Sequence, residues 1–228
     1  MRLPLEDPML DFAQARRMMV DSQVRTFDVN DLAVLAAFDE VPREGFVPAG
    51  RESLAYMDQN LPISDGDGPG ERRFMLAPMV LARMIQALEL APGQRVLDIG
   101  GGLGYSAAVL LRLGCSVIAL ETQDLAEAMR RRLAGVEGVA VEAGPLDRGC
   151  ADAAPYDAVL VNGAVETRPE TLLRQLAERG RLACLEGRGR TAQATLYVRS
   201  GDAFGARALF DAAAPSLAAF RAEPGFVF

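Results

Sequence analysis

A glycine-rich turn, "VLDIGGGLGY" at 96–105, holds the residues whose spacing is most suggestive of chemistry. Gly100, Gly102 and Gly104 follow a short apolar run and precede an alanine-rich amphipathic run. Glycines between a parallel strand and a helix let a ligand approach the backbone at the carboxyl end of the strand, where the first N–H groups of the helix are unpaired. This pattern predicts a binding site for a nucleotide-like cofactor.

Two acids narrow the choice of ligand. Asp98 ends the first predicted strand, where it can meet a cationic amino group, and Glu121 ends the second. A carboxylate about 20 residues after the glycines can accept both hydroxyls of a ribose. A ligand with a ribose, a positive charge and no phosphate is S-adenosylmethionine, whereas a dinucleotide favours GxGxxG spacing and no carboxylate so near its phosphates.

A purely structural interpretation of the two acids stays open at this point. Asp98 would then be a helix cap and Glu121 a solvated strand end. On the cofactor interpretation, we expect Glu121→Ala to weaken cofactor binding and leave the fold intact, because the strand end is otherwise exposed.

The chain contains no histidine, so its chemistry proceeds without the commonest general base and the usual metal ligand. Its cysteines are odd in number, widely spaced and without a CxxC pair, which argues against a disulfide framework or a zinc site. We expect Cys115, Cys150 and Cys184 to be free thiols, and Cys115 and Cys184 to be buried and inert.

Composition indicates an ordinary globular protein of 228 residues, half of them apolar, with a formal net charge of −7. This charge argues against nucleic acid as a partner. The basic triplet Arg130 to Arg132 is expected to be a solvated helix face. Apolar runs all fall short of the roughly 18 residues of a membrane span, so we expect no membrane partner and a cytoplasmic location.

Hydrophobic periodicity predicts the elements that position the site. Two helices are expected within 8–38, with Asp31 capping the second, and another helix is expected to begin at Pro78. A glycine-rich acidic loop at 61–73 is expected to be exposed and mobile. Short β-rich runs then alternate with helical segments, at 95–100, 116–121, 139–144, 156–163 and 180–186. Such alternation predicts an α/β fold with a doubly wound, mostly parallel sheet, and the runs 191–200 and 206–214 predict an antiparallel hairpin at its edge.

Nearly the whole chain resembles the protein-L-isoaspartate O-methyltransferase family of class I methyltransferases. The resemblance rests on "VPREGFVP", "AYMDQNLPIS", "APMVLARMIQAL", the glycine turn and the segment 154–182. It implies a seven-stranded methyltransferase sheet over 76–228. It also implies an N-terminal helical subdomain and substrate-loop region over 1–75, with an isoaspartyl peptide or protein as substrate.

Residue by residue, the resemblance assigns roles in binding S-adenosyl-L-methionine and the substrate. Its cofactor roles fall on Asp98, Gly100, Gly102, Gly104 and Glu121, with Pro145 and Leu146 in the segment that meets the adenine. Its substrate loop contains Asp58, Asn60 and Ser64. A carboxylate acceptor is already nucleophilic near neutral pH, so methyl transfer requires alignment and desolvation more than a general base.

Two departures from the family pattern bear on activity. Leu76 ends the run Arg73-Phe74-Met75-Leu76, where the family usually reads Gln-Thr-Ile-Ser, so the hydroxyl associated with catalysis is missing. Pro145 stands where the family has an aspartate near the adenine, and Asp147 or Asn162 are the candidates to replace it. We therefore expect weak or absent transfer to isoaspartyl peptides.

Two alternatives remain open. The chain is either a methyltransferase for another carboxyl or small-molecule acceptor, or a non-catalytic binding protein on the same fold.

Overall fold

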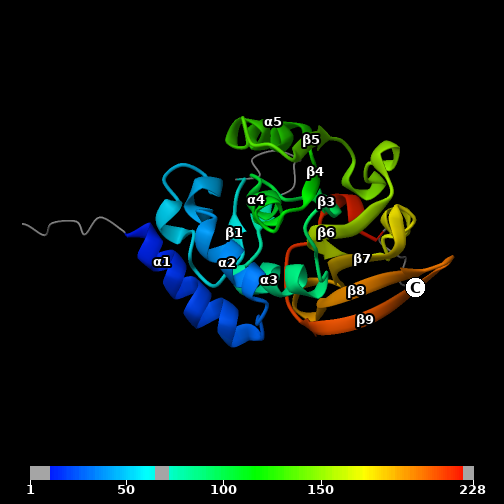
Figure 1. Ribbon diagram of the computed structural model, residues 1–228, viewed down its shortest axis with the longest axis horizontal. Coiled ribbons are helices and arrows are strands. Elements are labelled where there is room, and N and C mark those ends of the chain that lie inside the picture. Colours follow the sequence, from blue (N-terminus) through cyan, green and yellow to red (C-terminus); the bar gives the residue numbers. More distant parts are fainter. Residues whose placement is uncertain (1–10, 65–71, 223–228) are drawn as a thin grey trace, which may run out of the picture.

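A computed structural model describes residues 11–64 and 72–222 of the chain (Figure 1). Its centre is a seven-stranded sheet with the order β5-β4-β3-β6-β7-β8-β9. The first five of these strands run parallel, and β8 and β9 are antiparallel, which confirms the predicted fold class. The strands are β3 (Arg95–Ile99), β4 (Ser116–Glu121), β5 (Val139–Ala143), β6 (Tyr156–Val165), β7 (Leu176–Glu186), β8 (Gln193–Ser200) and β9 (Ala203–Asp211).

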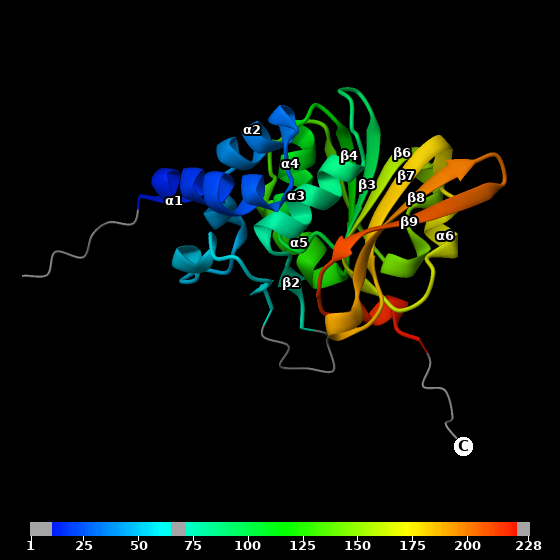
Figure 2. The same ribbon diagram turned by 90° about the horizontal axis from the view of Figure 1, so that it is seen from below.

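The two faces of the sheet are covered differently, as Figure 2 shows. Side chains alternate along the strands, so Val96 and Leu160 enter one core while Leu97 and Val159 enter the other. One face packs against α3 (Pro78–Ala87), α4 (Tyr105–Arg112) and α5 (Gln123–Arg132). The opposite face is covered by the four-residue helix α6 (Glu170–Leu173) and short 3-10 turns.

The N-terminal helices share the larger core with α3 and α4. Helix α1 (Phe12–Met19) continues into a π-helical turn, and α2 (Leu32–Glu40) follows. The predicted cap is confirmed, because the Asp31 carboxylate accepts hydrogen bonds from the backbone N–H groups of Ala33 and Val34. Apolar residues of the N-terminal helices therefore pack on the same face of the sheet as α4, the helix that follows the glycine turn.

A separate two-stranded ribbon precedes α3 in the chain. It pairs β1 (Leu61–Pro62) with β2 (Phe74–Met75) in antiparallel register. Residues 65–71, where most of the predicted mobile loop falls, lie outside the described part of the chain.

Cysteine and membrane expectations can be compared with this architecture. Cys115 and Cys184 are buried and free, as predicted, and Cys150 is partly buried and free. Burial raises the pKa of Cys115 and of Cys150 to about 11 each, so both stay protonated near neutral pH. Across 11–64 and 72–222, each helix is too short or too polar to cross a lipid bilayer.

Candidate functional site

The carboxyl ends of β3 and β4 bring Asp98 and Glu121 to one edge of the sheet. The strands are parallel and in register, with Ile99 opposite Leu120, so both acids point into the same region beside the glycine turn. Both side chains are completely buried. Buried carboxylates are costly unless donors surround them, so the partners of each acid define the site.

Asp98 lies in a buried hydrogen-bond network. Its carboxylate accepts from Ser106 Oγ and from Asn162 Nδ2, each at 2.7 Å. Burial raises the pKa of Asp98 to about 6, although these two hydrogen bonds lower it. Helix α4 begins after Gly104 without a side-chain cap, so the alternative role of Asp98 as a helix cap is wrong.

Glu121 is more heavily bonded. Its Oε1 accepts from the Gly102 N–H at 2.7 Å and its Oε2 from the Thr122 N–H at 2.8 Å. These two backbone donors fix the orientation of the carboxylate. The expectation of a solvated strand end is therefore wrong, and with it the reason for expecting Glu121→Ala to leave the fold intact, because Glu121 is covered by its own backbone donors and by Arg73.

Arg73 is the site residue that sequence reasoning missed. Its Nη1 and Nη2 donate to the two carboxylate oxygens of Glu121 at 3.0 and 2.8 Å, and Nη2 also donates to the carbonyl of Gly100 at 3.0 Å. Only 4% of Arg73 is exposed. The signal in the sequence was an arginine within an otherwise apolar segment, "RFMLAP", where buried charge calls for a partner.

The glycine turn is contacted by the chain's own side chains. Gly102 has a φ of +62°, and a Cβ built there would lie 2.1 Å from Ile63 Cδ1. At Gly100, with a φ of +70°, a Cβ would lie 2.9 Å from Arg73 Nη2 and 3.4 Å from Leu217 Cδ1. Both positions therefore require glycine for backbone conformation and for space, as the predicted ligand-binding turn requires.

The segment after β5 is divided between surface and core. Pro145 is exposed and lines a pocket of about 460 Å³ together with Gly144 and Arg148. Leu146 is buried under the sheet in the second core. The Leu146 side chain is therefore enclosed in the second core, and only the backbone of this residue is available to contact a ligand.

The two candidate replacements for the missing aspartate differ in their partners. Asn162 donates to Asp98 and to the Ile99 carbonyl, so its amide already belongs to the first network. The Asp147 carboxylate lies 3.7 Å from Arg148 Nε.

Residues of the predicted substrate loop occupy three different environments. Asn60 joins distant segments, because its Oδ1 accepts from the Ala77 N–H at 2.9 Å and its Nδ2 donates to the Ala213 carbonyl at 2.8 Å. Ser64 Oγ accepts from the Arg73 N–H at 2.9 Å. Asp58 is exposed.

A second buried arginine bonds the backbone before and after the predicted substrate loop. Arg43 is completely buried and donates to the carbonyls of Ala55 and Leu76, both at 2.7 Å. Its guanidinium carbon lies 4.7 Å from the ring centroid of Tyr105. Leu76, which replaces the family serine, is itself buried in the larger core. Arg43 therefore connects Ala55 and Leu76, which lie on either side of the predicted substrate loop in the sequence, to Tyr105 at the start of α4.

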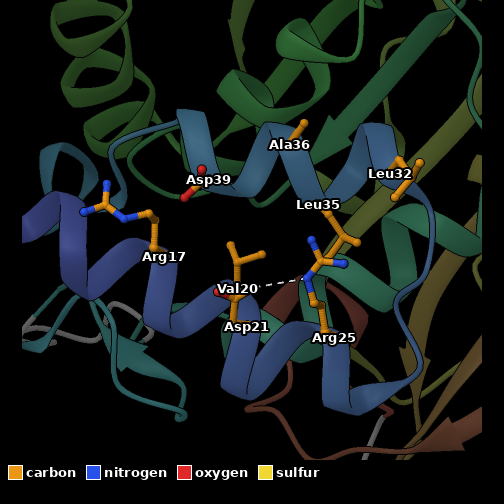
Figure 3. A pocket seen from close by; sticks show the side chains of 8 residues that line it. All are labelled: Arg17, Val20, Asp21, Arg25, Leu32, Leu35, Ala36 and Asp39. Atoms are coloured by element: carbon orange, nitrogen blue, oxygen red, sulfur yellow. Dashed lines mark hydrogen bonds and ion pairs between the residues drawn. The ribbon is translucent and has the colours of Figure 1, made fainter.

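A surface groove of about 240 Å³ lies away from these residues, between α1 with its π-helical extension and α2 (Figure 3). Arg25 and Asp21 form an ion pair at 3.1 Å along one wall, and Leu32 on the opposite helix is exposed. It shares no lining residue with the strand-end site, and its open, mixed-charge walls do not form a cofactor pocket.

Comparisons with known proteins agree with this geometry. The family model for protein-L-isoaspartate(D-aspartate) O-methyltransferase matches residues 14–207. A protein-L-isoaspartate O-methyltransferase of Methylorubrum extorquens (strain PA1) is 45% identical over 178 residues, which cover 77% of this chain and 75% of the relative. One from Roseiflexus castenholzii (strain DSM 13941 / HLO8) is 42% identical over 207 residues, which cover 89% and 91%.

Solved structures give the same fold. A protein-L-isoaspartate O-methyltransferase superposes with a TM-score of 0.77 at 28% identity, covering 88% of this chain and 65% of the other. A Plasmodium falciparum protein solved in complex with S-adenosyl-L-homocysteine superposes with a TM-score of 0.73 at 22% identity, covering 89% and 97%.

Proposed function

The chain belongs to the protein-L-isoaspartate(D-aspartate) O-methyltransferase family, and on that premise we propose that it methylates the carboxylate of isoaspartyl residues in damaged proteins. S-adenosylmethionine supplies the electrophilic methyl group when it is bound. The observation that carries the proposal is the pair of fully buried acids, Asp98 and Glu121, on either side of a glycine turn with positive φ angles.

The residues present suit this cofactor. Glu121 is oriented by two backbone donors, and the hydrogen bonds that Arg73 now makes to it are those that ribose hydroxyls would replace. Asp98 would hold the amino group, for which a buried carboxylate is the complementary charge. Gly100, Gly102 and Gly104 give backbone access, and Pro145 and Leu146 border the adenine.

The acceptor side depends on positioning. A carboxylate needs no general base to attack a methyl group, so what the chain must provide is orientation and exclusion of water. Asn60 connects the loop to Ala77 and Ala213, and Ser64 connects it to Arg73. We assign Asp58, Asn60 and Ser64 to the loop that meets the peptide, and residues 1–75 to the part that carries it.

One observation favours a second candidate, methyl transfer to a different carboxyl or small-molecule acceptor. Leu76 presents no hydroxyl and is 2% exposed, so it packs in the core and offers no donor to an acceptor carboxylate.

A cytoplasmic location is supported by the free thiols.

Methyl transfer from labelled S-adenosylmethionine tests the proposal. We expect slow labelling of a synthetic isoaspartyl peptide, because of the departures at Leu76 and Pro145, and no labelling of the matched aspartyl peptide. Transfer to a carboxylate other than the isoaspartyl one would instead support the second candidate. Failure of titration calorimetry to detect S-adenosylhomocysteine binding at millimolar concentration would reject both.

A further inference from the structure

We propose that Arg73 is an internal competitor for the cofactor, which binds only when the guanidinium leaves Glu121. Arg73 thereby sets cofactor affinity in this chain. The proposal rests on the assignment of Glu121 to the ribose in the proposed function, and its test is arranged so that the two can fail separately.

The first argument is the number of acceptor positions on Glu121. An ionised carboxylate offers about four lone-pair sites. The N–H groups of Gly102 and Thr122 use one site on each oxygen, the two Nη atoms of Arg73 take the others, and the Thr122 hydroxyl makes a longer contact with Oε2 at 3.4 Å. Two ribose hydroxyls require the same acceptors, so the ribose and the guanidinium exclude each other.

A second argument comes from the space around Arg73. The crevice that it lines with Leu76, Asn162 and Leu217 has a volume of about 10 Å³, whereas small-molecule pockets are typically about 300–1,000 Å³. Ile63 contacts Gly102 and Leu217 contacts Gly100, so the backbone of the glycine turn is also covered.

Arg73 and Ile63 form part of one unit. The Ile63 N–H donates to the Arg73 carbonyl at 2.9 Å, adjoining the pairing of Leu61 with Met75. The Ser64 hydroxyl accepts from the Arg73 N–H on the same ribbon. Because these bonds join the backbones of the two strands, a displacement of the ribbon moves Arg73 away from Glu121 and Ile63 away from Gly102 together, and so clears both the ribose site and the turn.

The expected consequence is a weakened apparent affinity. When only a fraction of the protein is competent, the apparent Kd equals the intrinsic Kd divided by that fraction. A buried ion pair resists removal of one partner, because the other would be left uncompensated. Arg73→Gln removes the charge and the two-pronged geometry, so Kd for S-adenosylhomocysteine should fall about tenfold or more, which corresponds to a competent fraction of roughly 10% or less in the parent chain.

The experiment is titration calorimetry with S-adenosylhomocysteine on the full chain and four variants. Arg73→Gln should bind about tenfold more tightly, and Arg73→Lys, which keeps the charge without the fork, should fall between it and the parent. Arg51→Gln is the matched control, because Arg51 donates to the Pro62 carbonyl of the same ribbon, whereas the side-chain donor to Glu121 from that ribbon, among the described residues, is Arg73. It should bind within about twofold of the parent. Thermal unfolding without ligand should show a lower Tm for Arg73→Gln, and this readout does not depend on activity.

Glu121→Ala separates the proposal from the site assignment. If Glu121→Ala abolishes binding while Arg73→Gln and Arg73→Lys bind no more tightly than the parent, Arg73 does not compete and the ribose assignment stands. Unchanged binding by Glu121→Ala would reject the ribose assignment itself, and the competition with it. Equal tightening by Arg51→Gln would attribute the gain to a loosened ribbon and would also overturn the proposal. Should Arg73→Gln fail to fold, Arg73→Lys carries the same comparison.

Discussion

At the scale of single residues, the site consists of two buried carboxylates with different environments. Glu121 is matched by a cation, Arg73, whereas the partners of Asp98 within 11–64 and 72–222 are neutral donors, Ser106 and Asn162. Burial therefore raises the pKa of Asp98 although two neutral donors bond its carboxylate. A cofactor ammonium would supply the charge that the Asp98 network lacks.

The first prediction is a pH dependence of cofactor binding. Asp98 has a pKa of about 6, so below that pH the cofactor-free protein carries a neutral acid, and binding an ammonium requires deprotonation. The Kd for S-adenosylhomocysteine should rise by up to tenfold per pH unit below about pH 6 and stay level above it. Calorimetry between about pH 5 and pH 8 measures this. Asp98→Asn should bind weakly and lose the slope, and a variant that keeps the slope would show that another group titrates.

The same pKa has a consequence for stability. The folded state holds the Asp98 proton more tightly than the unfolded state, whose pKa is near the ordinary 3.8. The contribution of Asp98 to folding is therefore most favourable below about pH 4 and declines as pH rises to about 6.

A second residue-scale prediction concerns the two departures from the family pattern. Leu76→Ser with Pro145→Asp should raise transfer to an isoaspartyl peptide more than either change alone, because one acts on the acceptor and the other on the cofactor. Leu76 is buried, so its replacement should also lower stability by about 2–5 kcal/mol. Leu76→Ala is the control, since it removes the same packing without adding a hydroxyl. Isoaspartyl transfer by the parent chain at the double variant's rate would mean that both departures are tolerated.

At the scale of elements, Arg43 connects the loop around the site to α4. Its guanidinium bonds one carbonyl at each end of the loop, at Ala55 and Leu76, and covers the ring of Tyr105 at the start of α4. Its Nη1 has no hydrogen-bond partner in the described structure, and burial lowers the pKa of Arg43. The two hydrogen bonds of Arg43 must therefore outweigh the free-energy cost of burying its guanidinium.

This balance gives a prediction for stability. Arg43→Met keeps most of the volume and leaves two buried carbonyls unpaired, each worth about 1–3 kcal/mol, so the free energy of unfolding should fall by roughly 2–5 kcal/mol. Arg43→Lys restores one donor and should lose about half as much. Urea denaturation of the three proteins measures the difference. Equal stability of parent and Arg43→Met would mean that desolvation of the guanidinium cancels its hydrogen bonds.

At the scale of the whole molecule, periodicity and the glycine turn were sufficient to predict the sheet, its antiparallel edge and the helix starts at Leu32 and Pro78. These features depend on local sequence. The burial of Glu121 could not be predicted in this way, because it depends on which distant segment covers the carboxylate. Arg73 and Glu121 are 48 residues apart, and their pairing required the ribbon to be placed against the sheet.

The contact between Asn60 and Ala213 joins residues 153 positions apart, and Leu217 lies against Gly100 from still further along the chain. A growing polypeptide lengthens by roughly 5–20 residues per second. The loop around the site must therefore wait on the order of ten seconds after Asn60 is made before the residue it bonds exists. Binding competence therefore arrives only after Ala213 and Leu217 have been made, so a nascent chain that stops before Ala213 lacks the carbonyl to which Asn60 donates.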